Sequence, residues 1–156
     1  KNPSSGDNGI VKCKHYDRDK FKGRKIVVEI AQQFIDEMIA HAQEDNPNEC
    51  CGILAGQTDR PVKTYRMMNV EASPYRYSMD SKELYHVYRE IEDNQLEMYA
   101  IYHSHTHTEA YPSATDIRLA TWPEAYYILI SLQNKQEPTV RAFTILDGQV
   151  SEVPIN

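Results

Sequence analysis

The chain has 156 residues, of which 40% are hydrophobic and 26% are charged, and its formal net charge at pH 7 is −6. This length suits a single domain, which buries about 68–70% of the surface of its unfolded chain. Residues 25–156 carry ten Lys and Arg against twenty Asp and Glu, a balance that disfavours nonspecific binding to nucleic acid. No apolar stretch is long enough to span a membrane and no signal-peptide pattern is present.

The first 24 residues differ in composition from the rest. They contain Asn-Pro-Ser-Ser-Gly-Asp-Asn-Gly followed by mixed charges, so we expect residues 1–24 to be a polar linker or tail and residues 25–156 to form the folded domain. The three cysteines, Cys13, Cys50 and Cys51, form neither a disulfide framework nor a C-x-x-C metal pair. We expect them to be free intracellular thiols, which predicts a cytoplasmic location.

Hydrophobic periodicity and turn residues predict an α/β domain. The predicted elements, in chain order, are a strand at 25–29, a helix at about 30–45, strands near 50–56 and 62–70, a possible strand at 75–79, a helix led by the capping pair Asp80 and Glu83, a strand at 97–103, a short helix within 114–121, and strands at 125–132, 139–146 and 149–153. The dipeptide Asp147-Gly148 predicts a hairpin turn into the last strand.

Residues 103–116 contain the spacing H-x-H-x7-S-x2-D, formed by His103, His105, Ser113 and Asp116. The histidines follow an apolar and aromatic stretch, so we expect them at the end of a strand. Residues two apart in a strand share a face and lie about 6.6 Å apart along its axis, so both imidazoles can reach one ion. Ser113 and Asp116 share a face at a helix start. Two nitrogens and one carboxylate oxygen leave one open position on a tetrahedral zinc, as a hydrolytic site requires.

Other interpretations of these residues stay open on spacing alone. Ser-x-x-Asp before an apolar turn is also a helix N-cap arrangement, and histidines at strand ends are often only hydrogen-bonded. His107 continues the alternation of His103 and His105, and three histidines are a known zinc arrangement. On a straight strand His103 and His107 would lie about 13 Å apart along the axis. We therefore expect His107 in the loop beside the site rather than among the ligands.

Glu49 is the candidate general base for such a site. It precedes the apolar run Cys50-Cys51-Gly52-Ile53-Leu54-Ala55-Gly56, which predicts a buried strand. A carboxylate at the mouth of a buried strand is either a solvated end residue or a positioned group. A competing hypothesis makes Cys50 or Cys51 a nucleophile that a nearby histidine activates, although vicinal cysteines in a buried strand are more often small core residues.

The combination of a Glu on an early strand, H-S-H and S-x-x-D resembles the motif of the JAMM (MPN-plus) zinc metalloproteases, a family of deubiquitinating isopeptidases and their bacterial relatives. All five motif positions are present, and they are Glu49, His103, His105, Ser113 and Asp116. The resemblance extends from about Lys25 to the C-terminus. It implies a single-domain JAMM/MPN fold, similar to that of cytidine deaminases, with a mixed β-sheet flanked by helices.

The resemblance also implies a role for each motif residue. His103, His105 and Asp116 would hold one Zn²⁺ per chain, which activates a water molecule as the nucleophile. Glu49 would take the proton of this water and pass it to the leaving amine, and Ser113 would donate a hydrogen bond to the developing oxyanion.

The run from Tyr102 to Asp116 is most similar to small bacterial members of the family, which release cysteine from the C-terminus of ubiquitin-like sulfur carrier proteins. The implied partner is a ubiquitin-like or sulfur carrier protein with a C-terminal Gly-Gly tail. A deubiquitinase-like isopeptidase acting on conjugates and an inactive metal-binding scaffold are the alternatives. Thr106 departs from the family, since many members have proline there, and this implies a less rigid loop. Tyr111, beside Pro112, is expected to border a substrate groove.

Overall fold

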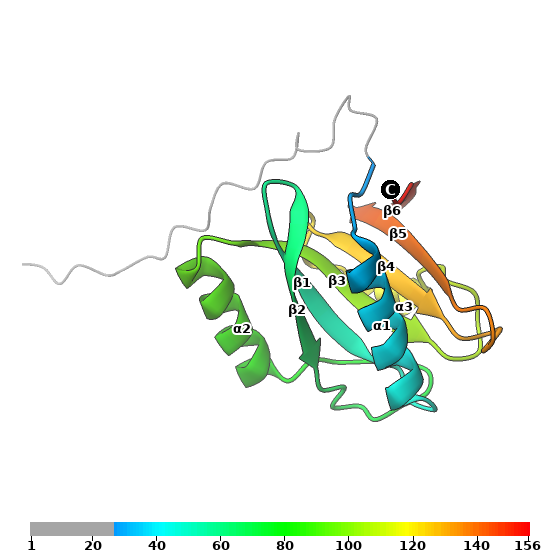
Figure 1. Ribbon diagram of the computed structural model, residues 1–156. Helices are drawn as coiled ribbons and strands as arrows, with labels where there is room; N and C mark the ends of the chain where they lie inside the picture. Colours follow the sequence, from blue (N-terminus) through cyan, green and yellow to red (C-terminus); the bar gives the residue numbers. More distant parts are fainter. Residues whose placement is uncertain (1–26) are drawn as a thin grey trace, which may run out of the picture.

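A computed structural model describes residues 27–156 and shows one six-stranded sheet with three helices packed around it (Figure 1). The strands lie in the order β2-β1-β3-β4-β5-β6, and β3 and β4 are the parallel pair among them, so the sheet is mixed. The strands are β1 Cys51–Gln57, β2 Arg60–Met67, β3 Glu97–His105, β4 Tyr126–Ser131, β5 Thr139–Leu146 and β6 Gln149–Val153. The helices are α1 Gln32–Asp45, α2 Ser81–Asp93 and α3 Ala114–Leu119. The predicted α/β class with a mixed sheet is confirmed.

Helix α1 covers one face of the sheet. Its buried residues Phe34, Met38 and Ala42 recur at helical spacing and pack against the central strands, where they contact the cluster that contains Leu54 and Tyr102. Burial of these apolar side chains is the main free-energy gain that holds α1 to the sheet. Because successive strand residues point to opposite faces, Ala100 and Tyr102 of β3 face α1.

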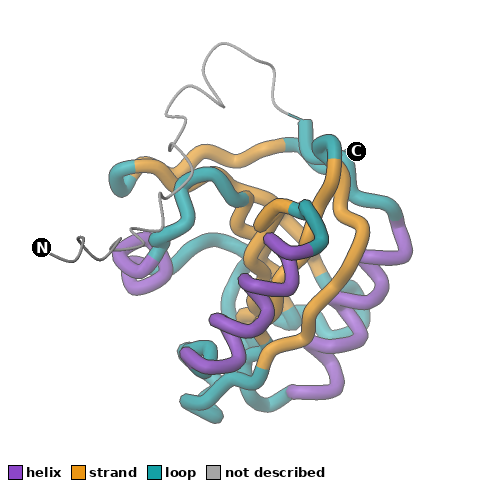
Figure 2. The backbone as a smooth tube through the Cα atoms, turned by 90° about the vertical axis from the view of Figure 1, so that its left-hand side faces the viewer, coloured by secondary structure: helices purple, strands orange, loops and turns teal. Residues whose placement is uncertain are grey.

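Helices α2 and α3 cover the opposite face, so the strands lie between helices in the view of Figure 2. Ile91 of α2 packs into a cluster with alternate residues of β1, and Ile117 of α3 packs against the cluster that contains Ile101 of β3. From Ile101 onward, the odd-numbered residues of β3 point to this side. His103 and His105 therefore lie on the face that α2 and α3 cover.

Gly52 permits the closest packing between β1 and β3. The ring of Tyr102 lies directly over Gly52, and a Cβ atom at position 52 would meet the Tyr102 Cζ atom at 2.2 Å. The Tyr102 hydroxyl lies 2.8 Å from His41 Nδ1, and His41 Nε2 lies 3.3 Å from Asp45 Oδ2. Since Asp45 accepts the Nε2 proton, the Tyr102 hydroxyl donates to Nδ1. This chain of polar groups, of which Tyr102 and His41 are buried, links α1 to the middle of the sheet.

Two of the predicted strands are wrong. In the segment 25–29, of which residues 27–29 are described, Val28 forms one isolated parallel bridge with Ile155. Its N–H donates to the Pro154 carbonyl and its carbonyl accepts the Asn156 N–H, but among the described residues the pairing stays limited to this one bridge. The segment 75–79 also forms one bridge, between Met79 and Asn69. The predicted domain boundary at residue 24 lies outside the described residues.

Two further predictions are right in kind and differ in detail. The strand predicted at 62–70 ends at Met67, because the Met68 N–H donates to the carboxylate of Glu83 at 3.2 Å instead of extending the sheet. Asp80 caps α2 through its side chain, as predicted, but Glu83 is used for this contact with Met68 rather than for a reciprocal cap. In the part of the chain that the structure describes, no helix is both long and apolar enough to cross a membrane.

Candidate metal centre

Strand β3 ends at the candidate site and supplies its two histidines. His103 and His105 are nearly fully buried and point to the same face. Their strand is flanked by β1, where Cys51 pairs with His103, and by the parallel strand β4, where Ser131 pairs with His105. The sheet therefore holds the backbone of His103 between two strands and that of His105 from the β4 side. The predicted position at a strand end is confirmed.

The start of α3 supplies Asp116. Ser113 is the N-cap of this helix: its Oγ accepts the Asp116 N–H at 3.1 Å, and Asp116 Oδ2 accepts the Ser113 N–H at 2.8 Å. This reciprocal pair is a capping box. The capping and metal-binding interpretations of Ser-x-x-Asp are thus compatible, because the same cap aims the Asp116 carboxylate at the two histidines.

Three side-chain atoms from these residues converge on one point. His103 Nε2 lies 3.2 Å from His105 Nε2, and the two nitrogens lie 3.2 and 3.1 Å from Asp116 Oδ2. A tetrahedral zinc with bonds of about 2.0–2.1 Å separates neighbouring ligand atoms by about 3.3–3.4 Å. The triangle is within a few tenths of an ångström of this size. Among the described residues, these three form the group of His, Cys, Asp or Glu side chains whose spacing suits a metal ion.

Neighbouring groups orient the two imidazoles. His105 Nδ1 lies 2.9 Å from the carbonyl oxygen of Glu109. This oxygen can only accept, so Nδ1 carries the proton and Nε2 keeps a lone pair free for a metal. The ring of Tyr77 stacks on His103 with 4.5 Å between centroids and 28° between planes. Sequence reasoning missed both contacts, because a backbone carbonyl and a tyrosine from another segment leave no recognisable spacing.

The electrostatics of the triangle favour an anionic Asp116 carboxylate and a neutral His103, whereas His105 is drawn towards its protonated form. Burial would raise the pKa of Asp116, but hydrogen bonds from His103 and His105 outweigh it and hold this pKa well below its usual range. Burial lowers the pKa of His103. For His105, burial acts in the same direction, but the hydrogen bonds to Asp116 and to the Glu109 carbonyl raise its pKa above the usual value. A divalent cation would replace the proton that the Asp116 carboxylate attracts to these rings.

Glu49 lies beside the triangle without belonging to it. It is 4% exposed, and both of its backbone groups are held: its N–H donates to the Ser73 carbonyl at 2.9 Å, and its carbonyl accepts from Asn69 Nδ2 at 3.0 Å. Burial raises the pKa of the Glu49 carboxyl to about 7, with the charge of His105 opposing the shift and that of Asp116 adding to it. A buried carboxyl that titrates near neutral pH is suited to accept and release a proton.

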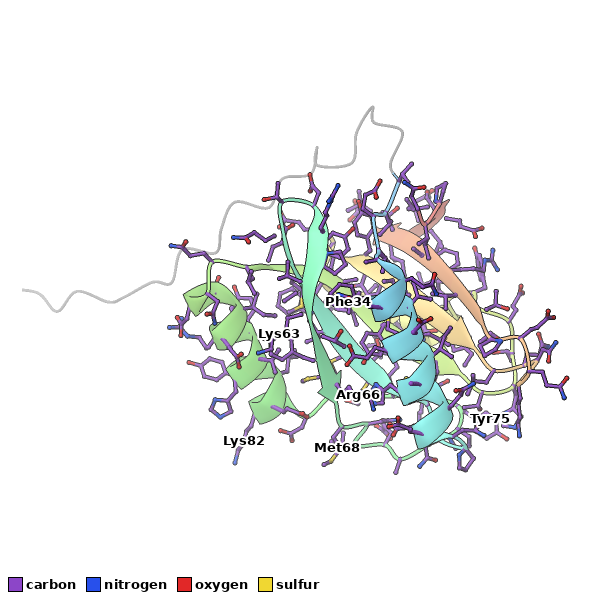
Figure 3. The ribbon with its side chains drawn as sticks, viewed as in Figure 1. Phe34, Lys63, Arg66, Met68, Tyr75 and Lys82 are labelled. Atoms are coloured by element: carbon purple, nitrogen blue, oxygen red, sulfur yellow. The ribbon has the colours of Figure 1, made fainter. Side chains whose placement is uncertain are left out.

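A hollow of about 490 Å³ opens on the other side of Glu49, towards α1. His41, Asp45, Arg66 and Asn69 are among the residues that line it, and Figure 3 shows Arg66 beside α1. The lining carries charges of both signs and includes none of the three candidate ligands. The hollow is therefore separate from the triangle, and Glu49 is the residue that borders both.

The other predicted residues lie around the triangle. His107 is in the loop after β3, where its Nδ1 contacts Thr106 Oγ1 at 2.7 Å, and it is not part of the ligand group. Tyr111 is 43% exposed, its ring packs edge-on against Phe143 of β5, and the Arg141 guanidinium lies over it at 5.8 Å. The structure thus places Tyr111 on the surface of the same loop, fixed by two residues of β5.

Cys50, which directly precedes β1, and Cys51, its first residue, are buried thiols. Cys50 and Cys51 are 0% exposed, and burial raises the pKa of both to about 12. Neighbouring residues of a strand point to opposite faces, and Cys50 and Cys51 pack into the clusters under α1 and α2 respectively. Because the thiolate is the nucleophilic form of cysteine, these positions do not favour the cysteine-hydrolase hypothesis.

Comparison with known proteins identifies the family. The model of the family described as "Prokaryotic homologs of the JAB domain" matches residues 31–146. The chain belongs to this family. The match to prokaryotic JAB-domain proteins spans Glu49, both histidines, Ser113 and Asp116, and it confirms the resemblance to JAMM/MPN proteins and the fold that this resemblance implies.

Named relatives agree with this family. A Mycobacterium tuberculosis protein named "CysO-cysteine peptidase" is 45% identical over 137 residues, which cover 86% of this chain and 94% of that protein. A Thermus thermophilus protein named "Probable TtuB-protein conjugate cleaving protease" is 31% identical over 125 residues, or 80% of each chain. A solution structure from Desulfitobacterium hafniense matches with a TM-score of 0.74 and 35% identity, over 84% of this chain and 92% of that one. This JAB-domain chain is a hydrolase of the peptidase type.

Proposed function

We propose that this chain is a zinc-dependent peptidase that cleaves the bond after the C-terminal Gly-Gly tail of a ubiquitin-like sulfur carrier protein. The observation that carries the proposal is the triangle of His103 Nε2, His105 Nε2 and Asp116 Oδ2, with the buried carboxyl of Glu49 beside it. The names of the relatives support the substrate class, since they refer to peptidases or proteases of carrier conjugates. A cytoplasmic location is part of the proposal and rests on the free thiols of Cys50 and Cys51.

His103, His105 and Asp116 would hold one zinc ion. When bound, Zn²⁺ lowers the pKa of a water molecule from 15.7 toward roughly 7 and polarises a carbonyl group. The protein supplies the orientation: the Glu109 carbonyl fixes the tautomer of His105, and the Ser113 N–H holds Oδ2 of Asp116 towards both rings. Such outer contacts hold the ligand set in place before the ion binds.

Glu49 acts as the general base and then as the general acid. Its carboxyl, with a pKa of about 7, takes a proton from the attacking water and gives it to the amine that leaves. A group whose pKa lies near the working pH can do both, because it is available in each protonation state.

Ser113 stabilises the charge that develops on the scissile carbonyl oxygen. Its Oγ already accepts the Asp116 N–H, which leaves the hydroxyl proton to donate. Loss of one oxyanion donor costs on the order of 10²–10³ in rate. The capping box fixes the Ser113 hydroxyl relative to the Asp116 carboxylate, so the oxyanion donor and the metal ligand keep a fixed relative position.

An extended tail is the form of substrate that suits this site. Main-chain hydrogen bonds to an added strand give affinity with little need for side chains, which matches a tail that ends in two glycines. Tyr111 is exposed on the metal loop and held by Phe143 and Arg141, so we assign it to the border of the substrate groove.

The proposal is tested by incubating the zinc-loaded chain with a carrier protein that ends in Gly-Gly-Cys and following release of cysteine by mass spectrometry. We expect cleavage that a chelator abolishes and zinc restores, with the Cys50→Ser/Cys51→Ser variant retaining activity. Chelator-resistant cleavage that requires either thiol would refute the metal mechanism. A second substrate, the same tail joined to a lysine side chain, separates the two peptidase classes: faster cleavage of this isopeptide assigns the chain to conjugate removal.

A further inference from the structure

The segment between β2 and α2, residues 69–79, contacts both Glu49 and His103, and we call it the strap. The side-chain amide of Asn69 holds the two ends of the strap together. It uses all four of its hydrogen bonds, two donated by Nδ2 and two accepted by Oδ1. The partners of Asn69 are the N–H groups of Glu71 and Ser78, each at 3.1 Å, and the carbonyls of Glu49 and Arg76, at 3.0 and 3.1 Å. The base of the strap is therefore closed, and the residue that closes it also holds the backbone of Glu49.

The middle of the strap contacts the site itself. The Ser73 carbonyl accepts the Glu49 N–H, and Tyr77 stacks on the ring of His103. Between them lies the tip, Pro74 and Tyr75. The side chain of Tyr75 is 79% exposed and projects from the lower edge of the molecule in Figure 3. The tip thus stands free of the core and needs its own attachment to keep a fixed position.

Thr106 provides this attachment from the strand that carries the histidines. It directly follows His105 and is 4% exposed, and its hydroxyl donates to the Pro74 carbonyl at 2.9 Å. The single hydroxyl proton is used in this bond, so the contact of 2.7 Å with His107 is donated by His107 Nδ1–H. The ring of His107 in turn stacks against Tyr75, with centroids 5.9 Å apart and 28° between planes.

We infer that Thr106 is a positioning residue that ties the tip of the strap to the metal-bearing strand and so sets the width of the substrate entrance. The inference rests on the proposed function. The tie requires a hydroxyl at position 106, which proline, common at this position in the family, does not have. It also requires the Pro74 carbonyl, because the buried Thr106 hydroxyl would otherwise be left unpaired. Glu49 keeps its own bonds to Ser73 and Asn69, so the tie acts on the entrance rather than on the chemical step.

Two matched pairs of variants isolate the hydroxyl. Thr106→Val keeps the branched shape of threonine without the hydroxyl, and Thr106→Ser keeps the hydroxyl without the methyl group. Thr106→Ala and Thr106→Ser differ by the hydroxyl alone and serve if the valine variant does not fold. Each zinc-loaded variant is measured for zinc content, for kcat and KM on the Gly-Gly-Cys carrier, and for hydrogen–deuterium exchange of the amides of residues 71–77.

We expect the variants without the hydroxyl to raise KM by about 3- to 10-fold, the range that loss of one hydrogen bond gives, with kcat within about twofold of wild type. Their strap amides should exchange faster, while Thr106→Ser should stay near wild type in both measurements. Unchanged hydrogen–deuterium exchange of residues 71–77 in the valine and alanine variants would refute the inferred role of Thr106. So would equal impairment of the serine variant, or a fall in kcat at constant KM. If the wild-type protein cleaves no carrier, the proposed function fails, and the exchange measurement still decides whether the tie exists.

Discussion

One oxygen atom, Oδ2 of Asp116, combines three tasks at the candidate centre. It faces Nε2 of both histidines and accepts the N–H of Ser113. A carboxylate oxygen has two lone pairs, so it can accept from the cap and still bind a metal. The helix cap and the ligand set are therefore one structure, and a change at Asp116 affects both. The histidines offer the cleaner test of metal binding.

We expect the protein to bind about one zinc per chain and the His103→Ala/His105→Ala double variant to lose it, because a single carboxylate does not hold the ion. His107→Ala is the matched control, since this histidine lies in the same loop outside the ligand group. Zinc is quantified by elemental analysis after dialysis. Full zinc retention in the double variant would disprove the ligand assignment.

Glu49→Gln separates catalysis from metal binding. The amide keeps the size of the side chain but cannot accept the proton of the attacking water, so kcat should fall on the order of 10²–10⁴-fold. Zinc content should stay near wild type, because Glu49 lies outside the triangle. The measurement is single-turnover cleavage with zinc determined on the same preparation, and Glu71→Gln is the surface control. A metal-replete, fully active Glu49→Gln variant contradicts the assigned role.

The residues of the centre differ in how far the sequence could predict them. His103, His105 and Asp116 lie within one short stretch, so their spacing is visible in the chain. Tyr77 contacts His103 from 26 positions away through a stacked ring, and Asn69 contacts Glu49 from 20 positions away through its amide side chain. Neither residue type is diagnostic of a metal site, so no sequence pattern identified them.

At the scale of secondary structure, the central elements were predictable because each has a strong local signal. The apolar run before Gln57 and the apolar and aromatic run before His103 form β1 and β3, with alternate residues packed on opposite faces. The two wrong strands, at 25–29 and 75–79, form one isolated bridge each among the described residues, with Ile155 and Asn69 respectively. Whether such a short segment pairs depends on residues far away in the chain, which its local pattern does not reveal.

We expect Gly52→Ala to destabilise the pairing of β1 with β3. The added Cβ would lie 2.2 Å from the Tyr102 ring, and relief requires the ring or a strand to shift, which costs about 1–3 kcal/mol or more. The midpoint of urea unfolding should fall accordingly. Adding Tyr102→Leu, which removes the outer part of the ring, should recover some of the loss. An unchanged midpoint in Gly52→Ala would show that the ring moves away freely.

At the scale of the whole molecule, global stability should depend on the buried His41. Burial lowers the pKa of His41, and the opposing charge of Asp45 does not restore it. The unfolded chain, with a histidine pKa of about 6.5, therefore binds more protons than the native state below that pH. The stability that neutral His41 contributes is complete above pH 6.5 and is lost as the pH falls towards the lowered native pKa, by up to about 1.4 kcal/mol per pH unit.

The test is the free energy of unfolding in urea between pH 7.5 and 5.5, for wild type and His41→Gln. Glutamine keeps a hydrogen-bonding side chain but does not titrate, so the pH dependence of the variant should be shallower. The difference between the two proteins cancels the contributions of His103 and His105, which both share. Parallel curves would show that His41 is protonated equally in the folded and unfolded states.

The placement of α3 between the parallel strands β3 and β4 has a consequence for how the protein folds. The three candidate ligands lie within fourteen consecutive residues, 103–116, so closing their loop costs little chain entropy. Glu49 lies two residues before β1 and 54 positions before His103, so the pairing of β1 with β3 is what brings it to the site. The three candidate ligands can therefore come together within a local unit, whereas the proton acceptor is added by a long-range contact. Under the proposed function, a chain in which β1 has not yet joined β3 has its ligand set but cannot cleave a substrate.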